Sequence, residues 1–175
     1  MAREPTVEEQ VAADLVASNL GGRVVHTDDG TASGVHDFEI VCGGVVVALE
    51  VTTTTDQRYR KSGSARKAKP KAGHAVPGPF IAKMDECVQA NVDKLRRATA
   101  TERHLSVWVD AVEVSVWAVL DGEYGLPALV LPGDVDELWA AQQYGGRESC
   151  APRRAWRYGN DVGWSEVPTG FSSAC

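Results

Sequence analysis

The sequence predicts an α/β domain. An amphipathic helix with a capped start precedes three strand-like runs, and a second amphipathic helix precedes a further strand-like run. Helical and strand patterns that follow each other in this way are typical of a sheet covered by helices. A length of 175 residues fits one domain, and we expect its core at about residues 5–120, a mobile basic loop at 53–79 and a C-terminal extension at 121–175.

The composition indicates a soluble protein of the cytoplasm. Hydrophobic residues make up 43% and charged residues 24% of the chain, and no apolar run approaches the roughly 18 residues of a membrane span. The opening residues lack the apolar stretch of a secretory signal, so we expect no membrane partner. The cysteines lack the C-x-x-C spacing of a zinc site, which predicts reduced thiols at Cys42, Cys87, Cys150 and Cys175.

The first helix is predicted to begin at a capping box. Thr6 is the N-cap, and Glu9 follows three residues later, where its side chain reaches back to the cap. The helix is expected to run to about Asn19, because Gly21 and Gly22 follow and end it. Glu9 therefore has a structural role.

The neighbouring acid, Glu8, is predicted to face the core. A period of 3.6 residues gives this helix one apolar stripe, and Glu8 lies in the middle of it. An unpaired acid that faces inward is costly, so Glu8 is a candidate functional residue. The stripe consists of Val7, Val11, Ala12 and Leu15.

Three strands are expected next, at residues 23–27, 36–42 and 45–52. Gly43 and Gly44 separate the last two strands and can supply positive φ, which predicts a hairpin.

A carboxylate interrupts the last of these strands. Successive side chains of a strand alternate between its faces, so Glu50 lies in a row that should be apolar, and the hairpin brings Asp37 near it. Mg²⁺ (or Mn²⁺) takes such hard oxygen ligands and keeps several waters, so two acids suffice for a site. The alternative is that Asp37 lies at a strand edge and Glu50 is partly exposed on a solvated face.

This order of elements resembles the PD-(D/E)xK nuclease superfamily, whose restriction-endonuclease-like core runs α-β-β-β-α-β. The matching residues are Glu8 for the helix acid, His36-Asp37 for the Pro-Asp element and Glu50-Val51-Thr52 for the (D/E)-x-K element. The resemblance implies a mixed sheet, here with a C-terminal hairpin extension. It also implies catalytic roles for Asp37, Glu50 and Thr52, and a Mg²⁺ or Mn²⁺ ion held by Asp37 and Glu50 with support from Glu8.

Thr52 stands where the family has a lysine that positions and polarises the attacking water. A hydroxyl carries no charge and does not titrate near neutrality. Lys83 and Lys94 on the second helix are alternatives, but both fall away from its apolar stripe and are expected to be solvated surface charges. Gln57 and Lys61 are further candidates without a spacing argument.

Positive charge is concentrated in one segment of an acidic protein. The net charge is −6, yet residues 57–74 carry seven basic residues and no acid, leaving 11 basic against 24 acidic residues elsewhere. The segment predicts a loop that contacts nucleic-acid phosphates, or alternatively a solvated loop or one that binds an acidic protein. Its basic residues are Arg58, Arg60, Lys61, Arg66, Lys67, Lys69 and Lys71.

The rest of the chain continues the alternation of helices and strands. We expect the second helix at 80–97, strands at 104–109 and 113–119, a short helix at 133–139 and a final hairpin at 155–167.

The final hairpin is rich in aromatic and basic residues. Its aromatic side chains either pack the hairpin or stack on unpaired bases. They are Trp156, Tyr158 and Trp164, flanked by Arg153, Arg154 and Arg157.

Metal-dependent hydrolysis of phosphodiester bonds in DNA or RNA is the predicted activity. The sequence has no metalloprotease or zinc-finger spacing, no G-x-S-x-G nucleophile elbow and no G-x-x-x-x-G-K-[ST] loop. The alternative is a nuclease-fold module without catalysis that binds nucleic acid or a partner protein through its basic loop. The choice of DNA or RNA, and whether the chain forms a homodimer, are left open.

Overall fold

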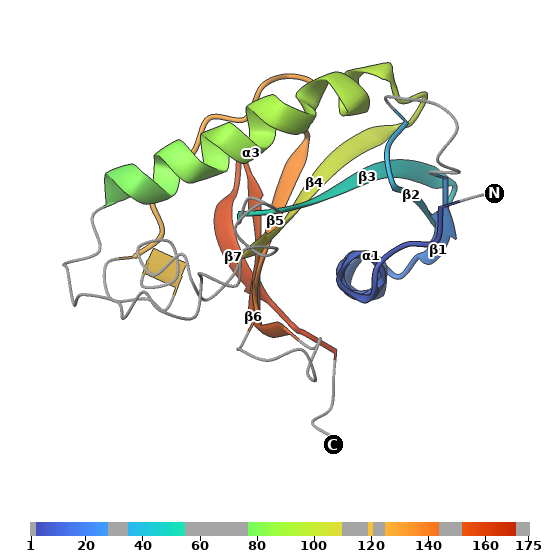
Figure 1. The fold of residues 1–175 in the computed structure, drawn as a ribbon, viewed down its shortest axis with the longest axis horizontal. Coiled ribbons are helices and arrows are strands. Elements are labelled where there is room, and N and C mark those ends of the chain that lie inside the picture. The colour runs from blue at the N-terminus through green and yellow to red at the C-terminus, as the bar shows by residue number, and fades with distance from the viewer. Residues whose placement is uncertain are drawn as a thin grey trace.

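The structure is a computed structural model that describes residues 3–27, 35–54, 77–109, 119–120, 125–143 and 152–170. Figure 1 shows how the helices and strands of these residues are arranged. The elements are α1 (Val7–Leu20), β1 (Arg23–His26), β2 (Phe38–Cys42), β3 (Val45–Thr53), α3 (Pro77–Arg97), β4 (Glu102–Val109), β5 (Glu137–Gln143), β6 (Pro152–Gly159) and β7 (Gly163–Val167). The α/β class agrees with the sequence prediction, as does the order α-β-β-β-α-β of the described elements up to β4.

The strands form one mixed sheet in the order β1-β2-β3-β4-β5-β6-β7. Strands β3, β4 and β5 are parallel, whereas the pairs on either side of them are antiparallel. Helix α3 connects β3 to its parallel neighbour β4, as a parallel pair requires a crossover.

The two helices cover opposite faces of the sheet (Figure 1). One buried cluster lies under α3 and includes Met84, Ala48 and Leu105, while the other lies under α1 and includes Val47 and Leu49. The valine-rich strand β3 therefore divides its side chains between both cores, as its alternation predicted.

The β2–β3 hairpin forms as predicted. Gly43 and Gly44 have φ of 55° and 86°, in the left-handed region that glycine adopts without a steric penalty. The register then pairs Phe38 with Leu49. Asp37 and Glu50 are the next residues along the two strands, which places them side by side.

The predicted short helix at 133–139 is wrong. A turn at Gly133-Asp134 leads into strand β5, which pairs with β4 from His104↔Glu137 onward. Residues 138–142 are all buried, with Leu138 in the core under α3 and Trp139 in the core under α1. A strand buried on both faces lacks the alternating pattern that marks an exposed strand, so its sequence does not distinguish it from a helix.

The final hairpin is confirmed, with β6 and β7 joined by a turn at residues 160–162. It belongs to the same sheet as the core strands. The predicted strand at 113–119 falls largely outside the described residues, as do the basic residues of 57–74. Among the described helices, none is long and apolar enough to cross a membrane.

Candidate functional site

Asp37 and Glu50 are both buried beside each other at the β2–β3 pair. The two residues are 4% and 2% exposed, which contradicts the alternative of a strand-edge acid and a partly solvated one. The backbone N–H of Val51 donates to Asp37 Oδ2 at 2.9 Å, so the hairpin itself fixes this carboxylate. Two acids that are withdrawn from water need partners to remain ionised.

Burial sets the protonation of both acids. The pKa of Glu50 is raised to about 7, first by desolvation and second by the negative charge of Asp37, whereas Lys94 lowers it. Desolvation also raises the pKa of Asp37, against the hydrogen bond from Val51 and the positive charge of Lys94, which lower it. Glu50 therefore exchanges its proton near neutral pH.

Lys94 lies at this pair of acids, and the expectation that it is a solvated surface charge is wrong. Its Nζ donates to Glu50 Oε1 at 2.5 Å, and its side chain is 37% exposed. Its charge also acts on Asp37. Lys83 pairs with Glu86 at 3.0 Å, and its side chain is only 22% exposed, so it is not a fully solvated charge either.

The position of Lys94 could have been predicted from α3, because the buried face of this helix is wider than its apolar stripe. The buried face of α3 also includes Phe80, Cys87, Asn91 and Ala98, which widen it on one side. At 100° per residue Lys94 is in line with these residues. A wider reading of the helix would have placed its ammonium group toward the sheet.

Arg3, which precedes α1, and Glu9, in the first turn of α1, lie near the same site. Arg3 Nη2 forms an ion pair with Glu9, and Arg3 Nη1 is 3.6 Å from Asp37 Oδ1. The charges of Glu9 and Arg3 act in opposite directions on the pKa of Asp37. Glu9, which the sequence assigned to the cap alone, therefore serves the cap and neighbours the carboxylate site.

Glu8 is half-buried on the same turn. The predicted stripe around it is shifted, because Val7 is 61% exposed whereas Ala13, Val16 and Ala17 are buried with Ala12 and Leu15. The described residues contain no group of three His, Cys, Asp or Glu side chains that could hold a metal ion. Glu8 thus does not join Asp37 and Glu50 in one such group.

Helix α1 has the predicted capping box. Glu9 N–H donates to Thr6 Oγ1 at 3.2 Å, and Thr6 N–H donates to Glu9 Oε2 at 2.7 Å. We expect Glu9→Ala to lower the free energy of unfolding by about 1 kcal/mol, because one orphan N–H at the helix start loses its acceptor. Denaturant unfolding measures this loss. Glu8→Ala is the neighbouring control, and an equal loss in both variants would argue against the capping role.

The two buried acids fit a divalent cation. They supply hard carboxylate oxygens, and Glu50 Oε2 is buried without a hydrogen-bond partner among the described residues. Thr52, the remaining predicted catalytic residue, is half-buried two residues further along β3 on the same strand face as Glu50. Its hydroxyl brings no positive charge to the site.

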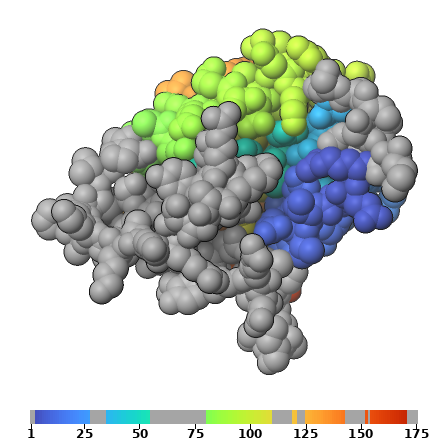
Figure 2. Space-filling view, viewed as in Figure 1, coloured from blue at the N-terminus to red at the C-terminus, as the bar shows by residue number. Residues whose placement is uncertain are grey.

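The strands that position the two acids reach the molecular surface between the two helices. Figure 2 shows atoms of β2 and β3, in cyan and teal, between the green surface of α3 and the blue surface of α1. The basic residues predicted to contact nucleic acid, from Arg58 to Lys71, lie outside the described residues.

The aromatic residues of the last hairpin are mostly packed. Trp156 and Tyr158 are each 3% exposed, and Trp164 contacts the core under α3. Trp108, expected in the core, is fully buried. The aromatic rings of this hairpin are therefore packed against other residues and are not fully exposed to solvent.

No protein-family model, curated protein or solved structure matches this chain.

Proposed function

We propose that the protein is a metal-dependent nuclease with a restriction-endonuclease-like core, in which Asp37, Glu50 and Lys94 form the active site. The observation that carries the proposal is the 2.5 Å contact between Lys94 Nζ and Glu50 Oε1 beside Asp37. It supplies from α3 the positive charge that Thr52 lacks in the motif. Two acids and a lysine on adjoining elements are the side chains that the resemblance requires.

Each residue has a distinct role in this mechanism. Asp37 and Glu50 would hold Mg²⁺ or Mn²⁺, and the bound ion would polarise the scissile phosphate and lower the pKa of a water. Lys94 would orient the attacking water and balance the negative charge that develops on the phosphate.

The substrate assignment rests on charge. A run of seven basic residues follows β3 in the sequence, and such residues attract the nucleic-acid backbone without reading its sequence. We propose DNA or RNA as the substrate.

Metal binding tests this proposal. Mn²⁺ at about 100 times its Kd should stabilise the wild type by roughly 2.7 kcal/mol, because it binds only the folded protein. The stabilisation should vanish in Asp37→Asn and Glu50→Gln, as followed by thermal unfolding. Asp93→Asn is a matched control, because Asp93 is exposed on α3 and its loss should leave the metal response intact. Equal stabilisation by Mn²⁺ in the wild type and in all variants would show that Asp37 and Glu50 do not bind the metal.

The alternative function is a non-catalytic binding module that contacts nucleic acid or an acidic partner protein through its basic loop. The observation in its favour is Thr52 at the position of the motif lysine. Such a module requires no metal, so nucleic-acid binding without a Mn²⁺ response or cleavage would favour it.

A further inference from the structure

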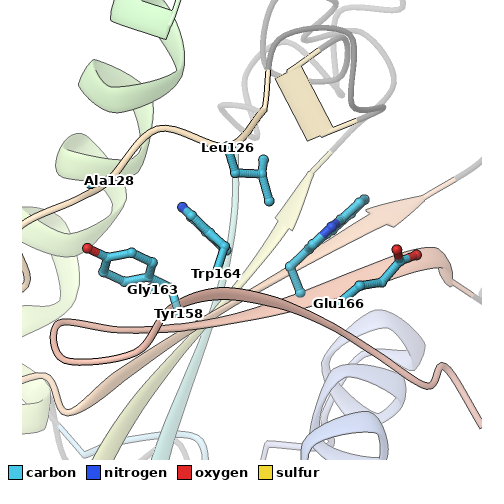
Figure 3. A pocket seen from close by; sticks show the side chains of 7 residues that line it. Leu126, Ala128, Tyr158, Gly163, Trp164 and Glu166 are labelled. Carbon is cyan, nitrogen blue, oxygen red and sulfur yellow. The ribbon is translucent and has the colours of Figure 1, made fainter.

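A pocket of about 410 Å³ lies beside the C-terminal hairpin, away from the carboxylate site. Figure 3 shows Leu126, Trp164 and Glu166 around it, with Tyr158 at one side. Its volume falls within the range of about 300–1,000 Å³ that is usual for small-molecule sites. Trp156 completes the aromatic lining.

The aromatic walls are held by hydrogen bonds at their polar ends. Trp164 Nε1 donates to the carbonyl of Pro127 at 2.8 Å. The Tyr158 hydroxyl accepts from Leu129 N–H at 3.0 Å and donates to the Leu129 carbonyl at 2.5 Å. These bonds fix the rings in place, so the pocket is formed before a ligand arrives.

A charge pair with no net charge lies at the pocket. Arg154 donates to both oxygens of Glu166, from Nε at 2.8 Å and Nη2 at 2.9 Å. The hydrogen bond from Arg154 lowers the pKa of Glu166, so this acid is ionised at neutral pH. The Arg154 guanidinium also lies over the Trp156 ring, 4.9 Å from its centroid. The compensated charge disfavours an organic cation and suits a neutral, planar ligand.

The pocket and the carboxylate site lie on the same face of the sheet. Trp156 and Tyr158 belong to the core under α3, and the Trp164 ring meets Phe80 of α3 at 5.9 Å. Phe80 and Lys94 are roughly 20 Å apart along α3, from a rise of about 1.5 Å per residue. A single-stranded nucleic acid several nucleotides long would reach both the pocket and the carboxylate site.

From these features we infer that the pocket binds an unpaired nucleobase of the nucleic-acid substrate, an inference that rests on the proposed function. The base stacks on the half-buried Trp164 ring, and the Glu166 carboxylate accepts a hydrogen bond from an exocyclic amino group. Adenine and cytosine carry such a group and thymine does not. The pocket therefore favours amino-bearing bases in single-stranded substrates.

Fluorescence anisotropy with short homopolymers tests the inference, in EDTA so that cleavage and metal binding do not contribute. The wild type should bind deoxyadenylate and deoxycytidylate oligomers more tightly than deoxythymidylate. Trp164→Leu should weaken binding of the amino-bearing oligomers about tenfold, since stacking of one base contributes roughly 1–3 kcal/mol. Trp164→Phe keeps a stacking ring and should retain most of the affinity, which separates stacking from a folding defect.

Glu166→Gln isolates the polar contact. Its side chain is 51% exposed, so folding should be unaffected, and the ratio of adenylate to thymidylate affinity should fall toward one. Glu86→Gln on α3 removes the same charge at a 69% exposed side chain and should leave that ratio unchanged. Wild-type affinity ratios in both pocket variants, or displacement of the oligomers by tetramethylammonium, would overturn the inference.

The carboxylate site can be tested separately. Glu50→Gln should bind the homopolymers as the wild type does in EDTA, and Trp164→Phe should keep the Mn²⁺ response. If the wild type shows the base preference but no metal-dependent cleavage, the nuclease proposal alone is refuted. If the wild type cleaves but shows no base preference, the pocket inference alone is refuted.

Discussion

Replacing Lys94 by methionine is expected to lower the rate of nucleic-acid cleavage by about a hundredfold or more. The substitution removes the ammonium group that lies against Glu50, and loss of one group that stabilises developing charge typically costs a factor of about 10²–10³. Methionine keeps an apolar side chain of similar length on α3, and Glu50 can take up a proton because its pKa is about 7. Cleavage of labelled DNA and RNA in Mg²⁺, with thermal unfolding in parallel, measures both effects.

Two further variants make this test specific. Lys83→Met removes a lysine from the same helix, where it pairs with Glu86, and should cleave as the wild type does. Thr52→Lys restores the motif lysine on the strand that carries Glu50 and should recover part of the activity lost in Lys94→Met. Normal cleavage by Lys94→Met would remove Lys94 from the mechanism.

The stability difference between Glu50→Gln and the wild type should depend strongly on pH. The folded-state pKa of Glu50 is about 7, above the ordinary value of 4.5, so the native state holds this proton where the unfolded state has lost it. The contribution of protonated Glu50 is complete below pH 4.5 and is lost as the pH rises through 7. Between these two pH values the free energy of unfolding of the wild type should fall by on the order of 3 kcal/mol relative to that of Glu50→Gln.

Denaturant unfolding of both proteins between pH 5 and pH 8.5 measures this difference. The metal response should follow the same titration, because a cation competes with the proton for Glu50. Mn²⁺ should therefore stabilise the wild type more at pH 8 than at pH 6. A pH-independent difference between the two proteins would mean that Glu50 is ionised throughout this range, with its charge balanced in the native state.

Local sequence signals determined several elements of this protein. The Thr6 and Glu9 side chains mark the start of α1, because a capping box satisfies backbone groups within one turn. Gly43 and Gly44 define the β2–β3 hairpin, because few other residues adopt two successive positive φ angles. That hairpin, with the alternation along β3, was enough to predict that Asp37 and Glu50 lie together.

Tertiary packing decided two features that these local signals do not specify: the contact of Lys94 with Glu50 and the conformation of β5. Lys94 and Glu50 are 44 residues apart, and their contact depends on how α3 lies across β3 and β4. Strand β5 takes its conformation from its neighbours β4 and β6, because burial on both faces removes the polar and apolar alternation from its sequence. Contacts between distant segments arise from the packing of whole elements, whereas caps and turns arise from a few adjacent residues. The sequence by itself therefore located the acids, and only the folded structure brought the lysine to them.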